Sequence, residues 1–306
     1  MKKTLLTAVV CWVAGMASAQ TPIFTDGLIM PKKLWGNGIY YGYDRWSKYW
    51  EGSLKRDNGN IGTLTTMSAT WMTVYGLTDK VTIVATLPYI WTKASGGTLH
   101  GLKGFQDVTF AAKYHFFNTD IGRSNLKFFA LGGFSFPTTN YTPDFLPLSI
   151  GLGSRNIYYR LTSSVTYNKV WFATLSGAYT WRSNIHLARP SYYTNGQLYY
   201  TNEVQMPNVF DFIFRAGYHV DRLHAELYYT QQNTLGGGDI RRQDMPVASN
   251  HMNAIKGGVS LMYAPKLLPN IQLRAWSNYT FAGRNVGQSI TVVAGAMYML
   301  NFSKQE

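Results

Sequence analysis

The sequence has little of what stabilises a small exported protein or anchors a helical membrane protein. Its 306 residues include one cysteine, Cys11, so a disulfide framework is excluded. After Gln20 no apolar run approaches the roughly 18 residues that a membrane-spanning helix requires. Charged residues make up only 14% of the chain, whereas aromatic residues make up 15%. A chain this rich in apolar and aromatic residues, but without long apolar runs, distributes its apolar residues in a short-period pattern.

The common catalytic signatures are missing as well. No G-x-S-x-G, P-loop or H-E-x-x-H pattern occurs, and the six histidines are scattered along the chain. We therefore expect no enzymatic activity and no cofactor. A membrane-embedded hydrolase is only the third functional hypothesis.

The N-terminus has the layout of a secretory signal peptide. Lys2 and Lys3 precede an apolar run, and Ala17-Ser18-Ala19 forms an A-x-A cleavage site before Gln20. Residues 1–19 are predicted to be removed, and Cys11 with them.

The chain is basic, with a net charge of +13. Its basic residues form no helical stripe, and an exported protein does not routinely meet nucleic acid, so we expect no nucleic-acid partner. Lipid A phosphates outside the molecule, or anionic solutes inside a pore, are better counterparts.

Residues 75–91 show the pattern that organises the rest of the sequence. Val81, Ile83 and Leu87 belong to an alternating apolar face, which is the period of a strand with two unlike faces. Aromatic residues bracket this face, with Tyr75 below the turn and Trp91 at the far end. About 11 residues, tilted by about 40°, span the roughly 25 Å apolar band of an outer membrane. The pattern predicts a membrane-spanning strand.

The same unit recurs about twelve times. It predicts an all-β protein: a transmembrane antiparallel up-and-down β-barrel over residues 33–302, preceded by an N-terminal periplasmic segment (20–32) and followed by a tail (303–306). A turn is expected at Asn118–Gly122. The expected strands cover residues 36–46, 62–75, 80–91, 105–116, 126–136, 157–167, 171–181, 210–218, 223–229, 255–263, 271–281 and 290–302.

Short turns and long loops alternate, as they do when turns face the periplasm and loops face outside. The ending Gly295-x-x-Tyr298-x-Leu300-x-Phe302 resembles the insertion signal of outer-membrane barrels. We therefore expect a porin-like protein of the Gram-negative outer membrane. Its expected partners are membrane lipid, lipopolysaccharide and the barrel-assembly machinery.

Three motifs carry a family resemblance: Tyr75-Gly-Leu-Thr-Asp-Lys80 with Leu87-Pro-Tyr89; Gly104-Phe-Gln-Asp107 leading to Ala112-Lys-Tyr114; and Leu131-Gly-Gly-Phe-Ser-Phe-Pro-Thr138. They resemble the family labelled MetA-pathway of phenol degradation, outer-membrane transporter barrels. The resemblance implies passage of a small solute, with aromatic molecules as one candidate class.

The predicted inward faces carry seven basic and three acidic residues. One interpretation is a structural ion network that fills a narrow barrel, and the other is a pore lining that favours anions. Lys256 and Arg274 rank above Arg215 as selectivity residues, because Arg215 lies diagonally from Glu226 across a hairpin. The full set is Asp107, Lys113, Lys127, Arg160, Arg182, Asp211, Arg215, Glu226, Lys256 and Arg274.

Two local features add hypotheses. With Asp221-Arg222 as a turn, His219 and His224 become cross-strand neighbours beside Glu226. We favour polar residues at the periplasmic mouth over a metal or proton site.

The loop 141–152 is unusually apolar and holds Phe145, Leu146, Leu148 and Ile150. A plug or rim packing is favoured, and a collection site for an amphipathic solute is the alternative.

The first functional hypothesis is a channel or transporter for a small, aromatic or anionic solute. The alternative is a structural or adhesion barrel that displays the tyrosines of the 183–206 loop, namely Tyr192, Tyr193, Tyr199 and Tyr200.

Overall fold

The computed structural model describes residues 22–241 and 246–302. The predicted signal peptide, its cleavage site and the tail 303–306 lie outside the described residues. Within the described ranges, no helix is long and apolar enough to cross a membrane.

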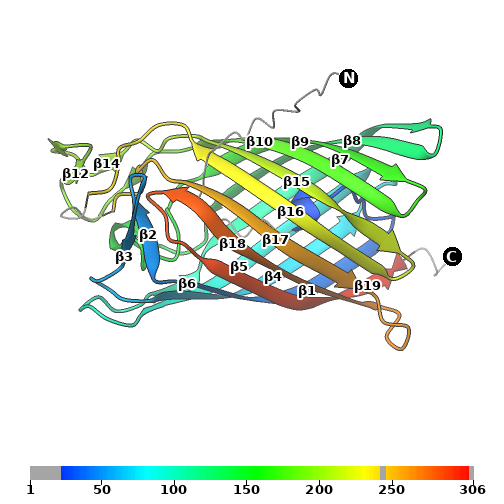
Figure 1. Cartoon of the computed structure of the whole chain (residues 1–306), viewed down its shortest axis with the longest axis horizontal. Helices are drawn as coiled ribbons and strands as arrows, with labels where there is room; N and C mark the ends of the chain where they lie inside the picture. Colours follow the sequence, from blue (N-terminus) through cyan, green and yellow to red (C-terminus); the bar gives the residue numbers. More distant parts are fainter. Residues whose placement is uncertain (1–21, 242–245, 303–306) are drawn as a thin grey trace, which may run out of the picture.

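Twelve long antiparallel strands form a closed barrel, because the last strand pairs with the first (Figure 1). Each strand also pairs with its neighbour in the chain, which confirms the predicted up-and-down β-barrel. The barrel strands are β1 (Leu34–Trp46), β4 (Leu64–Gly76), β5 (Val81–Ala94), β7 (Asp107–Ile121), β8 (Ser124–Pro137), β9 (Asn156–Tyr167), β10 (Trp171–Arg182), β15 (Val209–Val220), β16 (Leu223–Thr234), β17 (Asn253–Tyr263), β18 (Ile271–Arg284) and β19 (Ile290–Asn301).

The remaining elements are short. They gather with the long loops at one end of the barrel, and tight turns join the strands at the other end (Figure 1). Those at the loop end are β2 (Lys48–Glu51), β3 (Leu54–Asp57), β6 (Lys103–Phe105), β11 (Ile185–His186), β12 (Tyr192–Thr194), β13 (Gln197–Tyr199), β14 (Glu203–Val204) and a 3₁₀ turn, η1 (Pro143–Phe145). A four-residue helix, α1 (Pro22–Thr25), precedes the barrel strands in the chain.

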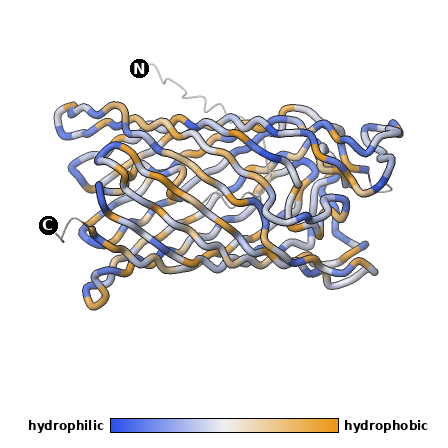
Figure 2. The backbone as a smooth tube through the Cα atoms, turned by 180° about the vertical axis from the view of Figure 1, so that it is seen from behind, coloured by the Kyte–Doolittle hydropathy of each residue, from blue (hydrophilic) through white to orange (hydrophobic). Residues whose placement is uncertain are grey.

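The two faces of each strand differ as the period-2 pattern predicts. In β10 the outward Leu175 is 45% exposed, whereas the inward Thr174 and Ser176 on either side are 1% exposed. Leu227 on β16 is 66% exposed in the same outward setting. Hydrophilic residues concentrate in the loops and turns at the two ends, as Figure 2 shows. The wall therefore presents an apolar face to its surroundings.

Aromatic residues mark the turn end of the outer face. Tyr167, Trp171 and Tyr263 are each about half exposed there, and Trp171 meets Tyr218 with ring centroids 5.9 Å apart. These exposed aromatic residues at the turn end match the aromatic girdle of membrane barrels.

The predicted turn at Asn118–Gly122 is wrong. Strand β7 continues to Ile121, after a register shift between His115 and Phe117. Asn and Asp normally favour turns, but here Asn118 and Asp120 accept hydrogen bonds from Asn125 of β8, at 2.7 and 2.8 Å. The chain reverses only at Gly122 and Arg123, where Gly122 takes a positive φ of 61°.

Candidate functional site in the barrel lumen

A stretch of chain outside the wall occupies the lumen. Residues 22–30, called the inner segment below, include α1 and contact inward side chains of several strands, among them β5, β7, β9, β15 and β18. Met30 N–H donates to Thr82 Oγ1 of β5 at 2.9 Å. At Gly27 the backbone comes so close to β9 that a Cβ atom would lie 2.3 Å from Ser164 Oγ. The sequence predicts a periplasmic segment over residues 20–32, whereas the structure places this part of it inside the barrel.

Asp26 anchors the inner segment to two basic residues of the wall. Lys113 Nζ on β7 donates to Asp26 Oδ1 at 2.9 Å, to the Asp26 carbonyl at 2.7 Å and to the Ile23 carbonyl at 3.3 Å. Arg274 Nη2 on β18 lies 3.4 Å from Asp26 Oδ2. Asp26 is 3% exposed, so the carboxylate is cut off from solvent and depends on these cations.

Arg215 extends the same cluster across β15 and β16. Its Nη2 donates to Thr25 Oγ1 at 2.6 Å, and its Nη1 donates to Glu226 Oε1 at 2.5 Å. Strand register pairs Arg215 with Tyr228, so Glu226, two residues earlier on β16, lies diagonally opposite Arg215, as the sequence predicts. Lys113, Arg215, Arg274, Asp26 and Glu226 together form the inner charge cluster, which holds three cations and two carboxylates.

The opposite side of the inner segment is apolar. Ile23, Phe24 and Met30 pack against a buried cluster inside the barrel. Within it Tyr40 and Trp276 meet with ring centroids 5.6 Å apart. The cluster comprises Tyr40, Met72, Val74, Val84, Tyr228, Trp276, Val293 and Met297. The lumen around the segment is thus apolar on one side and ionic on the other.

A second buried ion pair lies apart from the inner charge cluster. Arg160 Nη2 on β9 donates to Asp211 Oδ1 on β15 at 2.6 Å, and Arg160 Nη1 donates to Ser176 Oγ on β10 at 3.1 Å. Asp107, at the start of β7, accepts from the Tyr141 hydroxyl at 2.5 Å. These contacts link three successive wall strands, β9, β10 and β15, and tie β7 to a loop.

The remaining predicted lumen residues stay separate. Lys256 and Arg274 lie on neighbouring strands, but register sets Arg274 opposite Met262, and Lys256 opposite Thr280. Lys256 instead interacts electrostatically with Asp44 of β1. The last two predicted lumen residues lie in other parts of the wall. Lys127 is opposite Asn118 on one side and Ser164 on the other, and Arg182 is at the end of β10.

The histidine pair forms as register predicts. His219 lies opposite His224, with ring centroids 5.6 Å apart. His224 is buried, stacks on Phe172 and places Nε2 3.4 Å from Glu226 Oε2. In the described part of the chain, no group of three or more His, Cys, Asp or Glu is placed to hold a metal ion.

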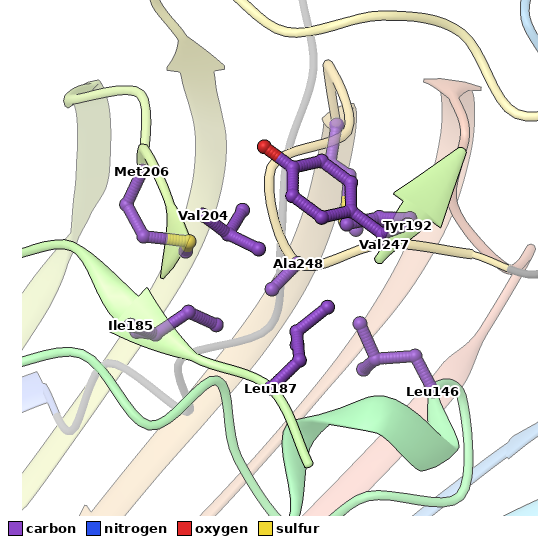
Figure 3. Close-up of a cluster of buried hydrophobic side chains, with 9 residues drawn as sticks. Leu146, Ile185, Leu187, Tyr192, Val204, Met206, Val247 and Ala248 are labelled. Carbon is purple, nitrogen blue, oxygen red and sulfur yellow. The ribbon is translucent and has the colours of Figure 1, made fainter. Parts of the chain in front are cut away.

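Three long loops fold together over the outer mouth. Figure 3 shows side chains of these loops pointing toward one another, among them Leu146, Leu187 and Val204. Asp144 ties two of the loops together, because its Oδ2 accepts from the Ala188 N–H at 3.0 Å. The outer loop core comprises Leu146, Ile185, Leu187, Tyr192, Val204, Met206, Val247, Ala248 and Met252.

The apolar loop of the sequence analysis divides between two environments. Leu146, Leu148 and Ile150 are at least 93% buried, and the Leu148 carbonyl accepts from Thr92 Oγ1 of β5 at 2.6 Å. Phe145 is 42% exposed. Most of this loop is packed at the mouth.

Sequence reasoning missed the inner segment and the contribution of residues 247–252 to the outer loop core. One signal for the inner segment was available: Asp26 is the only charged residue in a largely apolar stretch, 22–30, which is unusual for a solvated segment. Residues 247–252 offer no comparable signal, because their partners come from distant loops.

Comparison with solved structures gives the same architecture. An outer membrane channel from Pseudomonas putida F1 aligns over 89% of this chain and 97% of its own, with a TM-score of 0.71 and 16% identity. The NanC porin aligns over 86% of this chain and 100% of its own, with a TM-score of 0.47 and 11% identity. The β domain of the Bordetella autotransporter BrkA aligns over 88% of this chain and 100% of its own, with a TM-score of 0.47 and 13% identity. At 16% identity the likeness to the Pseudomonas putida channel shows the fold alone.

A comparison with curated protein sequences found no match. The family comparison did: residues 60–294 match the model of the family described as MetA-pathway of phenol degradation. This range begins before β4 and ends within β19, so it takes in nearly the whole wall of the barrel. The chain belongs to the MetA-pathway of phenol degradation family.

Proposed function

We propose that the protein is an outer-membrane channel or transporter for a small aromatic or anionic solute, and that it acts without catalysis. The observation that carries the proposal is the inner segment. The lumen is wide enough to hold a folded piece of chain that is not part of the wall. When that piece moves, the space that it leaves suits a small molecule.

The lining of this space supports the choice of solute. The inner charge cluster has one more cation than carboxylate, and such an excess in a low-dielectric lumen attracts anions. The apolar cluster with Tyr40 and Trp276 on the other side suits an aromatic ring. The family description, with its reference to phenol degradation, agrees with an aromatic solute.

The alternative, a structural or adhesion barrel, rests on the exposure of one loop. Tyr200 is 87% exposed and Tyr193 is 39% exposed, as a displayed loop requires. Tyr192, however, is buried in the outer loop core and stacks on Tyr199 with centroids 5.2 Å apart. Two of the four tyrosines therefore support the fold of the loops, which favours the channel.

Single-channel recording in a planar bilayer tests the proposal. Purified protein should give discrete conductance steps, and liposomes that contain it should take up a small aromatic anion faster than empty liposomes. Absence of both, together with cell binding that is lost when residues 192–200 are deleted, would favour the adhesion barrel. Fractionation of a Gram-negative host checks the proposed outer-membrane location.

A further inference from the structure

We propose that Lys113, Arg274 and Arg215 form a binding site for a small aromatic carboxylate, and that Asp26 of the inner segment occupies this site until such a solute displaces it. The inference rests on the proposed channel function and names the solute class for it. It also gives the inner segment a role, as a tethered competitor for the site.

The contacts of Asp26 are those of a bound carboxylate. One oxygen receives Lys113 Nζ at 2.9 Å, and the other faces Arg274 Nη2 at 3.4 Å. The second distance exceeds the roughly 2.8 Å of a good hydrogen bond between a cation and a carboxylate. In addition, Arg274 Nε and Arg215 Nε are buried and find no hydrogen-bond partner among the described residues. The cations therefore have donor capacity that Asp26 does not use.

The charges make the site depend on an anion. Glu226 belongs to the wall and stays beside Arg215, whereas Asp26 belongs to a segment outside the wall, to which the side chains of Lys113 and Arg274 hold it. If Asp26 leaves, Lys113 and Arg274 remain buried without a partner carboxylate. An uncompensated buried charge costs several kcal/mol. Departure of the segment is therefore favourable only when another anion replaces the carboxylate.

The inner segment also shows which anion fits. Phe24, which packs on the apolar cluster, lies two residues before Asp26, which binds the cations. The segment thus offers the lumen an aromatic ring and a carboxylate close together. An aromatic carboxylate offers the same pair of groups in one small molecule, with its ring against the wall around Trp276.

Benzoate is a suitable probe, with the uncharged benzamide as a control of the same shape. Isothermal titration calorimetry on the full chain in detergent would first compare three proteins: the unmodified protein, Asp26→Asn and Gly27→Val. Asp26→Asn removes the competing charge. Gly27→Val leaves every charge in place but dislodges the segment, because even a Cβ atom at this position lies 2.3 Å from Ser164 Oγ.

Both variants should bind benzoate more tightly than the unmodified protein. If the site is open about one tenth of the time, freeing it raises the apparent affinity about tenfold. Benzamide should bind none of the three measurably. The double variant Lys113→Met, Asp26→Asn balances the buried charge, so it should fold, yet it should lose the gain of Asp26→Asn.

Equal benzoate affinity in the unmodified protein and in both variants would overturn the inference, as would benzamide binding as tight as benzoate binding. Planar-bilayer recording on the same samples separates this failure from failure of the proposed function. Conductance without any change in benzoate affinity refutes the carboxylate site alone. Tighter binding in the variants without conductance in any sample supports the site and refutes the channel.

Discussion

Arg160 of β9 and Asp211 of β15 form a buried ion pair across an entire intervening strand, β10, with 2.6 Å between Nη2 and Oδ1. The curvature of a narrow barrel brings inward side chains of next-nearest strands within reach of each other. The two residues are 51 positions apart in the chain, and neither strand pairing nor hydrophobic pattern links them.

This pair gives the first prediction. Asp211→Asn should destabilise the barrel by about 3 to 5 kcal/mol, because Arg160 then remains buried without its carboxylate. The double variant Arg160→Met, Asp211→Leu should be closer to the unmodified protein. Urea unfolding in detergent, followed by tryptophan fluorescence, measures both. A double variant as unstable as the single one would mean that the pair does more than balance charge.

The outward face gives the second prediction. Leu175→Arg and Leu227→Arg should each cost about 2 to 4 kcal/mol, because both positions face the apolar part of the bilayer near mid-strand. Tyr200→Arg, in a loop where the side chain is 87% exposed, is the matched control and should have little effect. Reversible unfolding in lipid vesicles gives the comparison. Equal losses at positions 175 and 200 would contradict the assigned membrane face.

The third prediction concerns the selectivity of the open state. The unmodified channel should prefer anions, and Lys256→Glu should shift its reversal potential in a salt gradient toward cation preference. High salt should shrink that shift by screening. Lys266→Glu makes the same charge change on an exposed turn and should leave the reversal potential almost unchanged. A cation-selective unmodified channel would instead support the structural ion network.

The fourth prediction concerns pH at the outer loops. Asp239 accepts from Arg284 Nε at 2.8 Å and Nη2 at 2.7 Å, and these hydrogen bonds lower the pKa of the Asp239 carboxyl below its usual 3.8. Because the folded pKa is depressed, the pair stabilises the loop fully above pH 3.8 and loses this effect as pH falls through the lower folded pKa.

Proteolysis reads out this effect. Asp239→Asn should speed tryptic cleavage at Arg241 at neutral pH, where the unmodified loop keeps its ion pair. With pepsin near pH 2, well below the usual carboxyl pKa of 3.8, Asp239 carries less charge and the two proteins should be cut at more similar rates. A protection difference that persists undiminished in acid would assign it to loop packing rather than to the carboxylate.

The strands were predictable because each one satisfies a local rule. Alternation over residues such as 171–181 requires no knowledge of the partner strand, and β10 spans Trp171–Arg182. The diagonal pair of Arg215 and Glu226 was predictable for the same reason, since a tight turn fixes hairpin register. Prediction failed at β7, where a bulge and the side-chain bonds of Asn125 override turn composition.

The lumen contents were not predictable in this way. The inner segment is too short to show a period, and its contacts reach Lys113, 87 positions away, and Arg274, 248 positions away. Lys256 and Arg274 were expected to act together, but adjacent strands do not imply equal height in the barrel. Such contacts depend on how the sheet closes, which no local pattern encodes.

The inner segment also implies an order of events during folding. Its partners include Lys113 on β7, Arg215 on β15 and Arg274 on β18. The socket formed by these residues exists only once β19 has closed against β1. We therefore expect the earliest described residues, 22–30, to complete their native contacts only after the wall has closed. Their contacts depend on a wall whose final strand, β19, lies at the opposite end of the chain.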